Sequence, residues 1–139
     1  MAGEIASVLV VDDEPSICEL VQGTLGLYAG WRVRSAHTLQ RAIEALEEPP
    51  DLVLLDCVVG GEHGRDLLPL IRSRPELRAI PVIFLTGLVH DEDLRALWQS
   101  DAAGVLVKPF RPSELVPDIR RLLSQRGSVA LVSGAEAHP

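Results

Sequence analysis

The sequence predicts an α/β domain built on a doubly wound, five-stranded parallel sheet, a (βα)5 chain of alternating strands and helices. Short β-rich runs alternate five times with longer segments of helical periodicity, which is the pattern of a parallel sheet with crossover helices. Three of the runs, VLVV, LVLL and VIFL, are continuously apolar. Such runs are typical of central strands that helices cover on both faces.

The predicted strands are short and are followed by polar residues or turns. In chain order they are Val8–Val11, Trp31–Ala36, Leu52–Leu55, Val82–Leu85 and Val105–Val107. In the second strand Arg32 and Arg34 alternate with the other residues, so this strand is expected at an edge of the sheet.

The segments between and after the strands carry apolar residues at helical spacing. They predict helices at Ser16–Leu27, Leu39–Glu48, Arg65–Ser73, Glu92–Ser100 and about Pro112 to Gln125. Pro69 and Pro117 lie beyond the first turn of these helices, where proline removes a hydrogen bond and bends the axis. After Arg126 the chain is rich in Gly, Ser and Ala, so we expect a single domain at 1–126 and a flexible tail or the start of a linker at 127–139.

Composition excludes several classes of protein. With 139 residues and 47% apolar side chains, the chain is expected to form one domain with its own core. Its net charge of −7 argues against direct nucleic-acid binding, which depends on clustered Lys and Arg. Cys18 and Cys57 form no CxxC motif, which favours reduced thiols and excludes a zinc site. Because no apolar run is long enough to insert into a membrane, we expect a soluble, cytoplasmic protein.

Polar side chains follow four of the five predicted strands. Because the carboxyl ends of parallel strands meet at one edge of the sheet, these side chains are expected to converge. They are Asp12, Asp13 and Glu14 after the first strand, Asp56 after the third, Thr86 with Gly87 after the fourth, and Lys108 with Pro109 after the fifth. Lys108 is the only lysine among 13 basic residues, and the others are arginine. This exception indicates that position 108 requires a compact, movable ammonium group.

The three aspartates predict a divalent cation. Two negative charges about 4 Å apart repel each other by roughly 4 kcal/mol near a protein surface, so three require a cation or a raised pKa. Mg²⁺ prefers one or two carboxylates together with phosphate oxygens, and a carboxylate beside it can attack phosphorus to form an aspartyl phosphate. Asp56 stands alone at a central strand end and is the expected nucleophile, whereas Asp12 and Asp13 form the metal-holding pair.

The remaining residues suit phosphoryl transfer. Lys108 would neutralise a phosphoryl oxygen, Thr86 would donate a hydrogen bond, and Gly87 would leave the line of attack open. Each of these residues taken alone has an ordinary interpretation. In particular, Asp13 in front of Glu14 could be the N-cap of a helix without any metal.

Four motifs follow each other along the chain: VLVVDDEP at 8–15, LVLLD at 52–56, PVIFLTG at 81–87 and VLVKPF at 105–110. Separations of 43, 30 and 22 residues link Asp13, Asp56, Thr86 and Lys108, and Gly64 follows eight positions after Asp56. Over residues 5–125 this pattern resembles the receiver domain of two-component response regulators. The resemblance implies a CheY-like, flavodoxin-like fold with strand order 2-1-3-4-5.

The resemblance also implies roles for single residues. Asp12, Asp13 and Asp56 would bind Mg²⁺ together with the backbone carbonyl of Val58. Asp56 would accept a phosphoryl group from the phosphohistidine of a sensor histidine kinase or a phosphotransfer protein, in a phosphorelay. The domain would catalyse its own phosphorylation and dephosphorylation without being a multi-turnover enzyme.

The same resemblance implies how the phosphorylated state would signal. The hydroxyl of Thr86 would turn toward the phosphoryl group, and Lys108 would pair with it; the Lys108–Pro109 peptide matches a bond that is cis in this family. A downstream protein or a fused output domain would respond. A phosphorylation-dependent homodimer would use the fourth helix, the fifth strand and the fifth helix.

The chain departs from the family pattern at three places. After Asp56 the family usually carries Met or Leu and then Pro, whereas Val59, Gly60 and Gly61 stand here, so we expect a looser loop. Val105 replaces the usual Tyr or Phe that moves with the switch hydroxyl. Before the fifth strand, Asp101 and Ala103–Gly104 replace the family's more typical Gly-Ala-Asp run, so we expect a different local turn.

Two alternatives to the phosphoacceptor hypothesis remain open from the sequence. One is a receiver fold kept as a phosphorylation-independent scaffold, which the missing aromatic at Val105 favours. The other is a Mg²⁺ phosphohydrolase of the haloacid dehalogenase type with Asp12 as its nucleophile, since Asp12-x-Glu14 approaches the D-x-D motif of that class.

Overall fold

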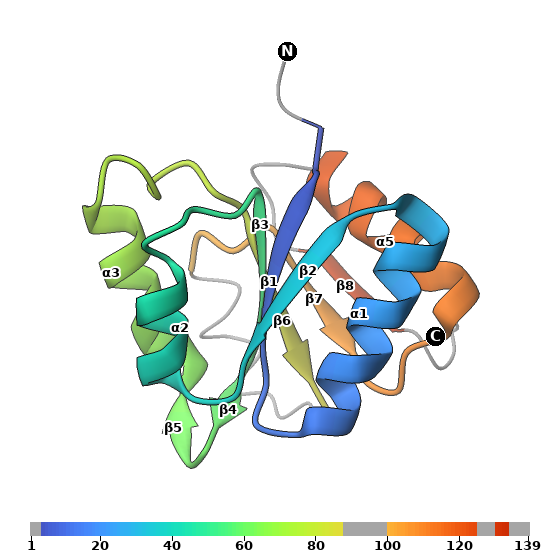
Figure 1. Ribbon diagram of the computed structural model, residues 1–139, viewed down its shortest axis with the longest axis horizontal. Helices are drawn as coiled ribbons and strands as arrows, with labels where there is room; N and C mark the ends of the chain where they lie inside the picture. The colour runs from blue at the N-terminus through green and yellow to red at the C-terminus, as the bar shows by residue number, and fades with distance from the viewer. Residues whose placement is uncertain (1–3, 88–99, 125–129, 134–139) are drawn as a thin grey trace.

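A computed structural model of the chain describes residues 4–87, 100–124 and 130–133. Within them the main sheet has six strands, all of them parallel. Its order is β2 (Arg32–Ala36), β1 (Ser7–Val11), β3 (Leu52–Asp56), β6 (Val82–Thr86), β7 (Gly104–Val107) and β8 (Ala130–Ser133). The five predicted strands and their order 2-1-3-4-5 are confirmed, with β6 and β7 as the fourth and fifth. The predicted edge position of β2 is confirmed as well (Figure 1).

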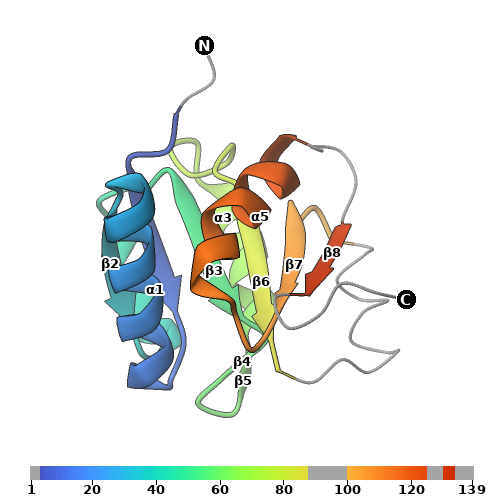
Figure 2. The same cartoon turned by 90° about the vertical axis from the view of Figure 1, so that its right-hand side faces the viewer.

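The sixth strand is a correction to the predicted tail. Residues 127–139 were expected to be a flexible tail or the start of a linker, but within them Ala130–Ser133 pairs with β7 in parallel register, from Gly104 opposite Ala130 to Val107 opposite Ser133 (Figure 2). The physical reason lies in the preceding helix. β7, α5 (Pro112–Ser124) and β8 form one more strand–helix–strand unit, which places the second strand beside the first. Composition did not predict this strand, because small residues surround its short apolar run, ALV.

Helices cover both faces of the sheet. On one face lie α1 (Pro15–Ala29) and α5, and on the other lie α2 (Leu39–Ala45) and α3 (Leu68–Ser73) (Figure 1). The predicted helix Glu92–Ser100 falls outside the described residues, apart from Ser100. Among the helices in the described parts of the chain, none combines the length and the apolar character needed to cross a bilayer.

The third predicted helix is two elements, and this division explains Pro69. A 3-10 helix, η1 (Gly64–Leu67), precedes α3, which begins only at Leu68. Pro69 therefore lies in the first turn of α3, where a backbone N–H has no intrahelical partner to lose. Pro117 lies inside α5, and nothing in the structure explains it.

The core is divided between the two faces by the alternation of side chains along each strand. In β3, Val53 and Leu55 belong to the cluster under α2 and α3, whereas Leu52 and Leu54 belong to the cluster under α1 and α5. All five residues of β3 are buried, as expected for a central strand. The strand that ends in Asp56 is therefore covered along its whole length.

A hairpin follows β3 where we expected a looser loop, and this expectation is wrong. β4 (Val58–Val59) and β5 (Glu62–His63) pair antiparallel, and Gly60 and Gly61 connect them with φ angles of 60° and 84°. Positive φ at both central positions is the requirement of a type I′ hairpin turn, and two glycines meet that requirement without steric cost. The glycines that replace the family's proline thus build an ordered turn.

Candidate functional site

The polar residues predicted to converge do lie at one end of the sheet. Asp12 and Asp13 follow β1, Asp56 ends β3, Thr86 ends β6, and Lys108 follows β7. The strands run in parallel and deliver these residues to the same rim, where the β4–β5 hairpin also lies (Figure 1).

Three carboxylates form the centre of this rim. Oxygen atoms of Asp12, Asp13 and Asp56 all lie within 4.8 Å of one another. Asp12 and Asp56 are buried, whereas Asp13 is exposed. These hard oxygen donors, one of them open to solvent, are the ligand type that Mg²⁺ prefers, so the residues fit a divalent cation.

Lys108 is the cation that the structure places among these carboxylates. Its Nζ lies 2.8 Å from Oδ2 of Asp12 and 3.3 Å from Oδ2 of Asp56. It also lies 3.4 Å from Oε1 of Glu14, a contact to which the sequence analysis gave no role. The signal for Glu14 was its position directly after the aspartate pair. The only lysine of the chain is thus held by three acidic side chains at the rim.

The charges of the rim perturb each other. Burial, with the negative charge of Asp12 in addition, raises the pKa of Asp56 to about 6, although Lys108 acts in the opposite direction. Burial acts to lower the pKa of Lys108, but the hydrogen bond to Asp12 and the charge of Asp56 outweigh it and raise that pKa above its ordinary value. One ammonium therefore faces more negative charge than it neutralises, and a further cation would be stabilised here.

Backbone N–H groups orient the two aspartates that follow β1. Glu14 N donates to Oδ1 of Asp12 at 2.9 Å, so both oxygens of that buried carboxylate have partners. Asp13 does not cap α1, because the N-cap residue is Glu14. Oδ2 of Asp13 instead accepts a hydrogen bond from Gly60 N at 3.0 Å. The interpretation of Asp13 as a helix N-cap is therefore wrong. Sequence spacing could not have indicated this hairpin contact.

The segment after Asp56 is held close to it. Val58 N approaches Oδ1 of Asp56 at 3.5 Å, and the side chain of Val58 is 50% exposed. Gly64 N donates to the carbonyl of Cys57 at 2.8 Å, and a Cβ added to Gly64 would overlap the carbonyl oxygen of Asp56. Position 64 therefore requires glycine, because the backbone there passes too close to Asp56 to leave room for a Cβ.

The other predicted residues lie beside the rim. Thr86 is buried, and its carbonyl accepts a hydrogen bond from Lys108 N at 2.8 Å. Gly87 is exposed, and a Cβ there would stand 3.9 Å from the Lys108 side chain, an ordinary contact. Val105 is fully buried in the core under α2 and α3. The peptide Lys108–Pro109 is cis, as the resemblance implied.

Comparison with known families agrees with this geometry. The sequence profile of the response regulator receiver domain matches residues 8–120. The chain belongs to the response regulator receiver family. Among its relatives, the receiver domain is 36% identical over 135 residues to the "Probable transcriptional regulatory protein TcrX" of Mycobacterium tuberculosis, covering 96% of this chain and 56% of that protein. It is 33% identical over 125 residues to the phosphate regulon transcriptional regulatory protein PhoB of Escherichia coli, covering 89% and 54%.

Solved receiver structures share the fold. Chemotaxis protein CheY4 of Vibrio cholerae matches the receiver domain with a TM-score of 0.77 and 29% identity, over 86% of this chain and all of that one. A BeF3-activated DrrB receiver domain matches with a TM-score of 0.73 and 28% identity, over 88% and 100%. The chain spans about half the length of the curated relatives that it matches, but the full length of these two receiver structures.

Proposed function

We propose that this receiver domain accepts a phosphoryl group on the carboxylate of Asp56, from a sensor histidine kinase or a phosphotransfer protein, in a reaction that depends on Mg²⁺. The observation that carries the proposal is the gathering of Asp12, Asp13 and Asp56 within 4.8 Å of one another. The ammonium of Lys108 lies 2.8 Å from Asp12 and 3.3 Å from Asp56. Membership of the receiver family supports the same role.

Each residue of the rim has a defined task in this transfer. Mg²⁺, held by Asp12, Asp13, Asp56 and the backbone carbonyl of Val58, would supply positive charge to the phosphoryl oxygens. With a pKa raised to about 6, Asp56 is mostly ionised at neutral pH and can attack phosphorus. An O–P bond to Asp56 would form as the N–P bond of the donor phosphohistidine breaks, and the donor's imidazole would leave with the electron pair. Lys108 would pair with a phosphoryl oxygen.

Thr86 and its surroundings would convert the phosphorylation of Asp56 into a structural change. The hydroxyl of Thr86 would donate to the phosphoryl group. The resulting movement of Thr86 would pass to the end of β7 through the hydrogen bond between Lys108 N and the Thr86 carbonyl. The aromatic partner found in most of the family is replaced by Val105, so the change would travel through backbone movement of β6 and β7. Gly87 and Pro109 flank the two strand ends and would allow that movement.

The response to phosphorylation would come from a further domain or from a separate protein. The relatives named as transcriptional regulators are about twice as long as this chain, which supports a fused output domain or a separate downstream protein as partner. Phosphorylation would favour a homodimer through β7, α5 and the predicted fourth helix, which lies outside the described residues apart from Ser100. The domain would act in the cytoplasm, and it would catalyse only its own phosphorylation and dephosphorylation.

Asp12 is a poor alternative nucleophile. Its side chain is 0% exposed, and its two oxygens are held by Glu14 N and Lys108 Nζ. This arrangement disfavours the haloacid dehalogenase hypothesis. Trapping with beryllofluoride separates the two: an adduct at Asp56 supports the receiver function, and an adduct at Asp12 contradicts it.

The direct test is phosphorylation by acetyl phosphate with Mg²⁺, followed by intact-protein mass spectrometry. The protein is expected to gain one phosphoryl group, Asp56→Asn none, and Asp66→Asn, which alters an exposed carboxylate on η1, as much as the unchanged protein. If no Asp56-dependent gain appears with either acetyl phosphate or a phosphorylated kinase, the proposal fails and the scaffold hypothesis replaces it.

A further inference from the structure

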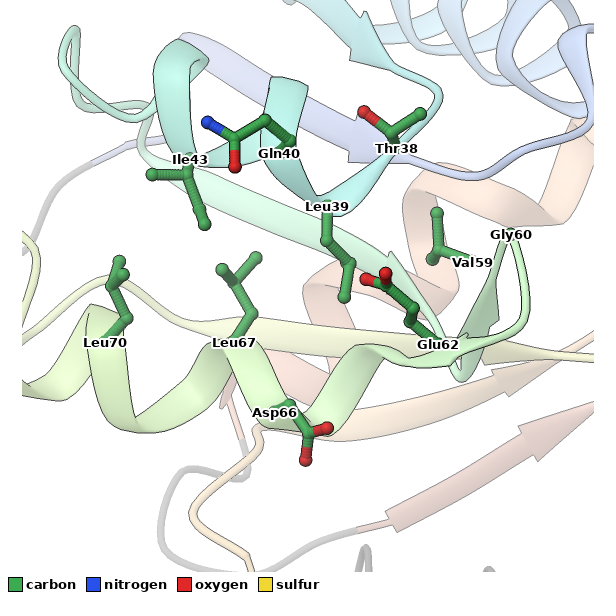
Figure 3. A pocket seen from close by; sticks show the side chains of 10 residues that line it. All are labelled: Thr38, Leu39, Gln40, Ile43, Val59, Gly60, Glu62, Asp66, Leu67 and Leu70. Carbon is green, nitrogen blue, oxygen red and sulfur yellow. The ribbon is translucent and has the colours of Figure 1, made fainter.

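A second candidate site lies on the face of the sheet that α2 and α3 cover. It is a cavity of about 370 Å³, formed by the start of α2, the β4–β5 hairpin, and η1 with the first turn of α3 (Figure 3). None of its lining residues, all of which belong to the described part of the chain, is a member of the acidic cluster. Its size falls in the lower part of the range of small-molecule pockets, roughly 300–1,000 Å³.

The inner surface of the cavity is aliphatic. Leu67 and Leu70 point from η1 and α3 toward Leu39 and Ile43 of α2, as the close-up shows (Figure 3). Leu67 is buried, whereas the other three are partly open, so part of the apolar surface faces the cavity. An apolar body of matching size would remove this surface from water, which is the main source of affinity in such pockets.

The charge around this aliphatic surface has one sign. Glu62 of β5 and Asp66 of η1 line the cavity; the side chain of Glu62 points toward Leu39, whereas that of Asp66 points away from the aliphatic side chains (Figure 3). No lysine, arginine or histidine is among the described residues that line it. Glu62 is exposed, so its carboxylate remains hydrated and available to an incoming charge. A ligand that complements this surface carries a positive charge next to an apolar body.

We propose that this cavity binds a small organic cation, with an ammonium or guanidinium group on a compact aliphatic or aromatic body. The body packs between Leu39, Ile43 and Leu67, and the cationic group pairs with Glu62. The proposal does not depend on phosphorylation, because the cavity is formed without it.

The position of the cavity gives it a local reporter. Gly60, at the turn of the hairpin, forms part of the wall, and its N–H donates to Oδ2 of Asp13. A ligand that contacts the hairpin therefore shifts the amide resonance of Gly60 even when no divalent cation is present. Unrelated surface binding would not concentrate its effect at Gly60, Glu62 and Leu39.

The test is a titration of the isotopically labelled, metal-free full chain with phenethylammonium, followed by two-dimensional NMR. We expect saturable shifts that concentrate on Leu39, Gly60 and Glu62, with a dissociation constant on the order of 1 mM. The anion 3-phenylpropionate, which has a similar apolar body, is expected to cause no saturable shift. Without this difference between cation and anion, the charge argument is wrong.

Two matched variants test the carboxylates. Glu62→Gln keeps the shape of the side chain and is expected to weaken binding roughly threefold to fivefold, the effect of one exposed ion pair. Glu76→Gln alters an exposed carboxylate outside the cavity and is expected to leave binding unchanged. Asp66→Asn alters the carboxylate that points away from the aliphatic side chains, and it is expected to weaken binding less than Glu62→Gln does. Non-saturable shifts, or equal binding by all of these proteins, would overturn the proposal.

Discussion

The two ends of β3 carry an aspartate each, and the structure treats them in opposite ways. Before the strand, Oδ2 of Asp51 accepts hydrogen bonds from Ala6 N at 2.8 Å and Ser7 N at 3.0 Å, which join β3 to the start of β1. At its other end, Asp56 lies among other carboxylates, and burial raises its pKa to about 6. The same residue type therefore stabilises one end of the strand and destabilises the other, as expected where a function needs concentrated charge.

The largest expected effect comes from closing the space around the functional end. In Gly64→Ala the added methyl group overlaps the carbonyl oxygen of Asp56 and stands 3.1 Å from Leu55 Cγ, so the chain must move away from the site. We expect a loss of about 3 kcal/mol in the free energy of unfolding, measured by urea denaturation.

A glycine in open space is the control for this substitution. At Gly23 in α1 nothing lies within 4 Å of an added Cβ, and alanine there should stabilise the helix by up to about 1 kcal/mol. If Gly64→Ala were as stable as Gly23→Ala, the close approach between Gly64 and Asp56 would not exist in solution.

The structural end of β3 is tested by Asp51→Ala. The substitution leaves the N–H groups of Ala6 and Ser7 without their carboxylate acceptor, and because the site is exposed, water replaces part of the loss. We expect a decrease of about 2 kcal/mol in the free energy of unfolding. Asp51→Asn, which keeps one acceptor oxygen, should lose less than Asp51→Ala; an equal loss would assign the effect to something other than these hydrogen bonds.

The functional end is expected to respond with the opposite sign. Because the pKa of Asp56 is raised to about 6 in the folded protein, protonated Asp56 favours folding, and this stability is lost as the pH rises from about 4 through 6. In Asp56→Asn the loss does not occur, so at pH 8 with EDTA the variant should be more stable by about 1 to 2 kcal/mol after allowance for solvent screening.

Urea denaturation of both proteins at several pH values checks this sign. The difference between Asp56→Asn and the unchanged protein should grow from near zero at pH 4 to its full value above pH 7. A difference that is constant with pH would show that ionisation of Asp56 is not its cause.

The smallest expected effect comes from adding a divalent cation to the acidic cluster at the functional end. Mg²⁺ at roughly five times its dissociation constant should stabilise the protein by about 1 kcal/mol, because it binds the folded acidic cluster. The thermal midpoint should rise with Mg²⁺ in the unchanged protein and in Asp51→Asn, but much less in Asp56→Asn. An equal rise in all three would place the cation elsewhere.

Much of the site was accessible from the sequence because the fold delivers it by a simple rule. An apolar run followed directly by a polar residue marks a strand end, and parallel strands place such ends together. This rule located Asp12, Asp56, Thr86 and Lys108. It could not reach contacts across loops, such as the hydrogen bond between Gly60 N and Asp13, because loop conformation has no such periodicity.

Local sequence patterns specify the five predicted strands, the edge position of β2 and the polar residues of the rim, since apolar runs and their ends are local signals; the strand order followed from the resemblance to the receiver family. Long-range contacts determine that Ala130–Ser133 adds a sixth strand, that Gly60 and Gly61 form a hairpin turn, and that Lys108 lies within reach of three carboxylates. The physical reason is that each depends on a partner distant in the chain. β7 offers an open edge, Asp13 offers an acceptor, and the rim concentrates negative charge, none of which a local pattern contains.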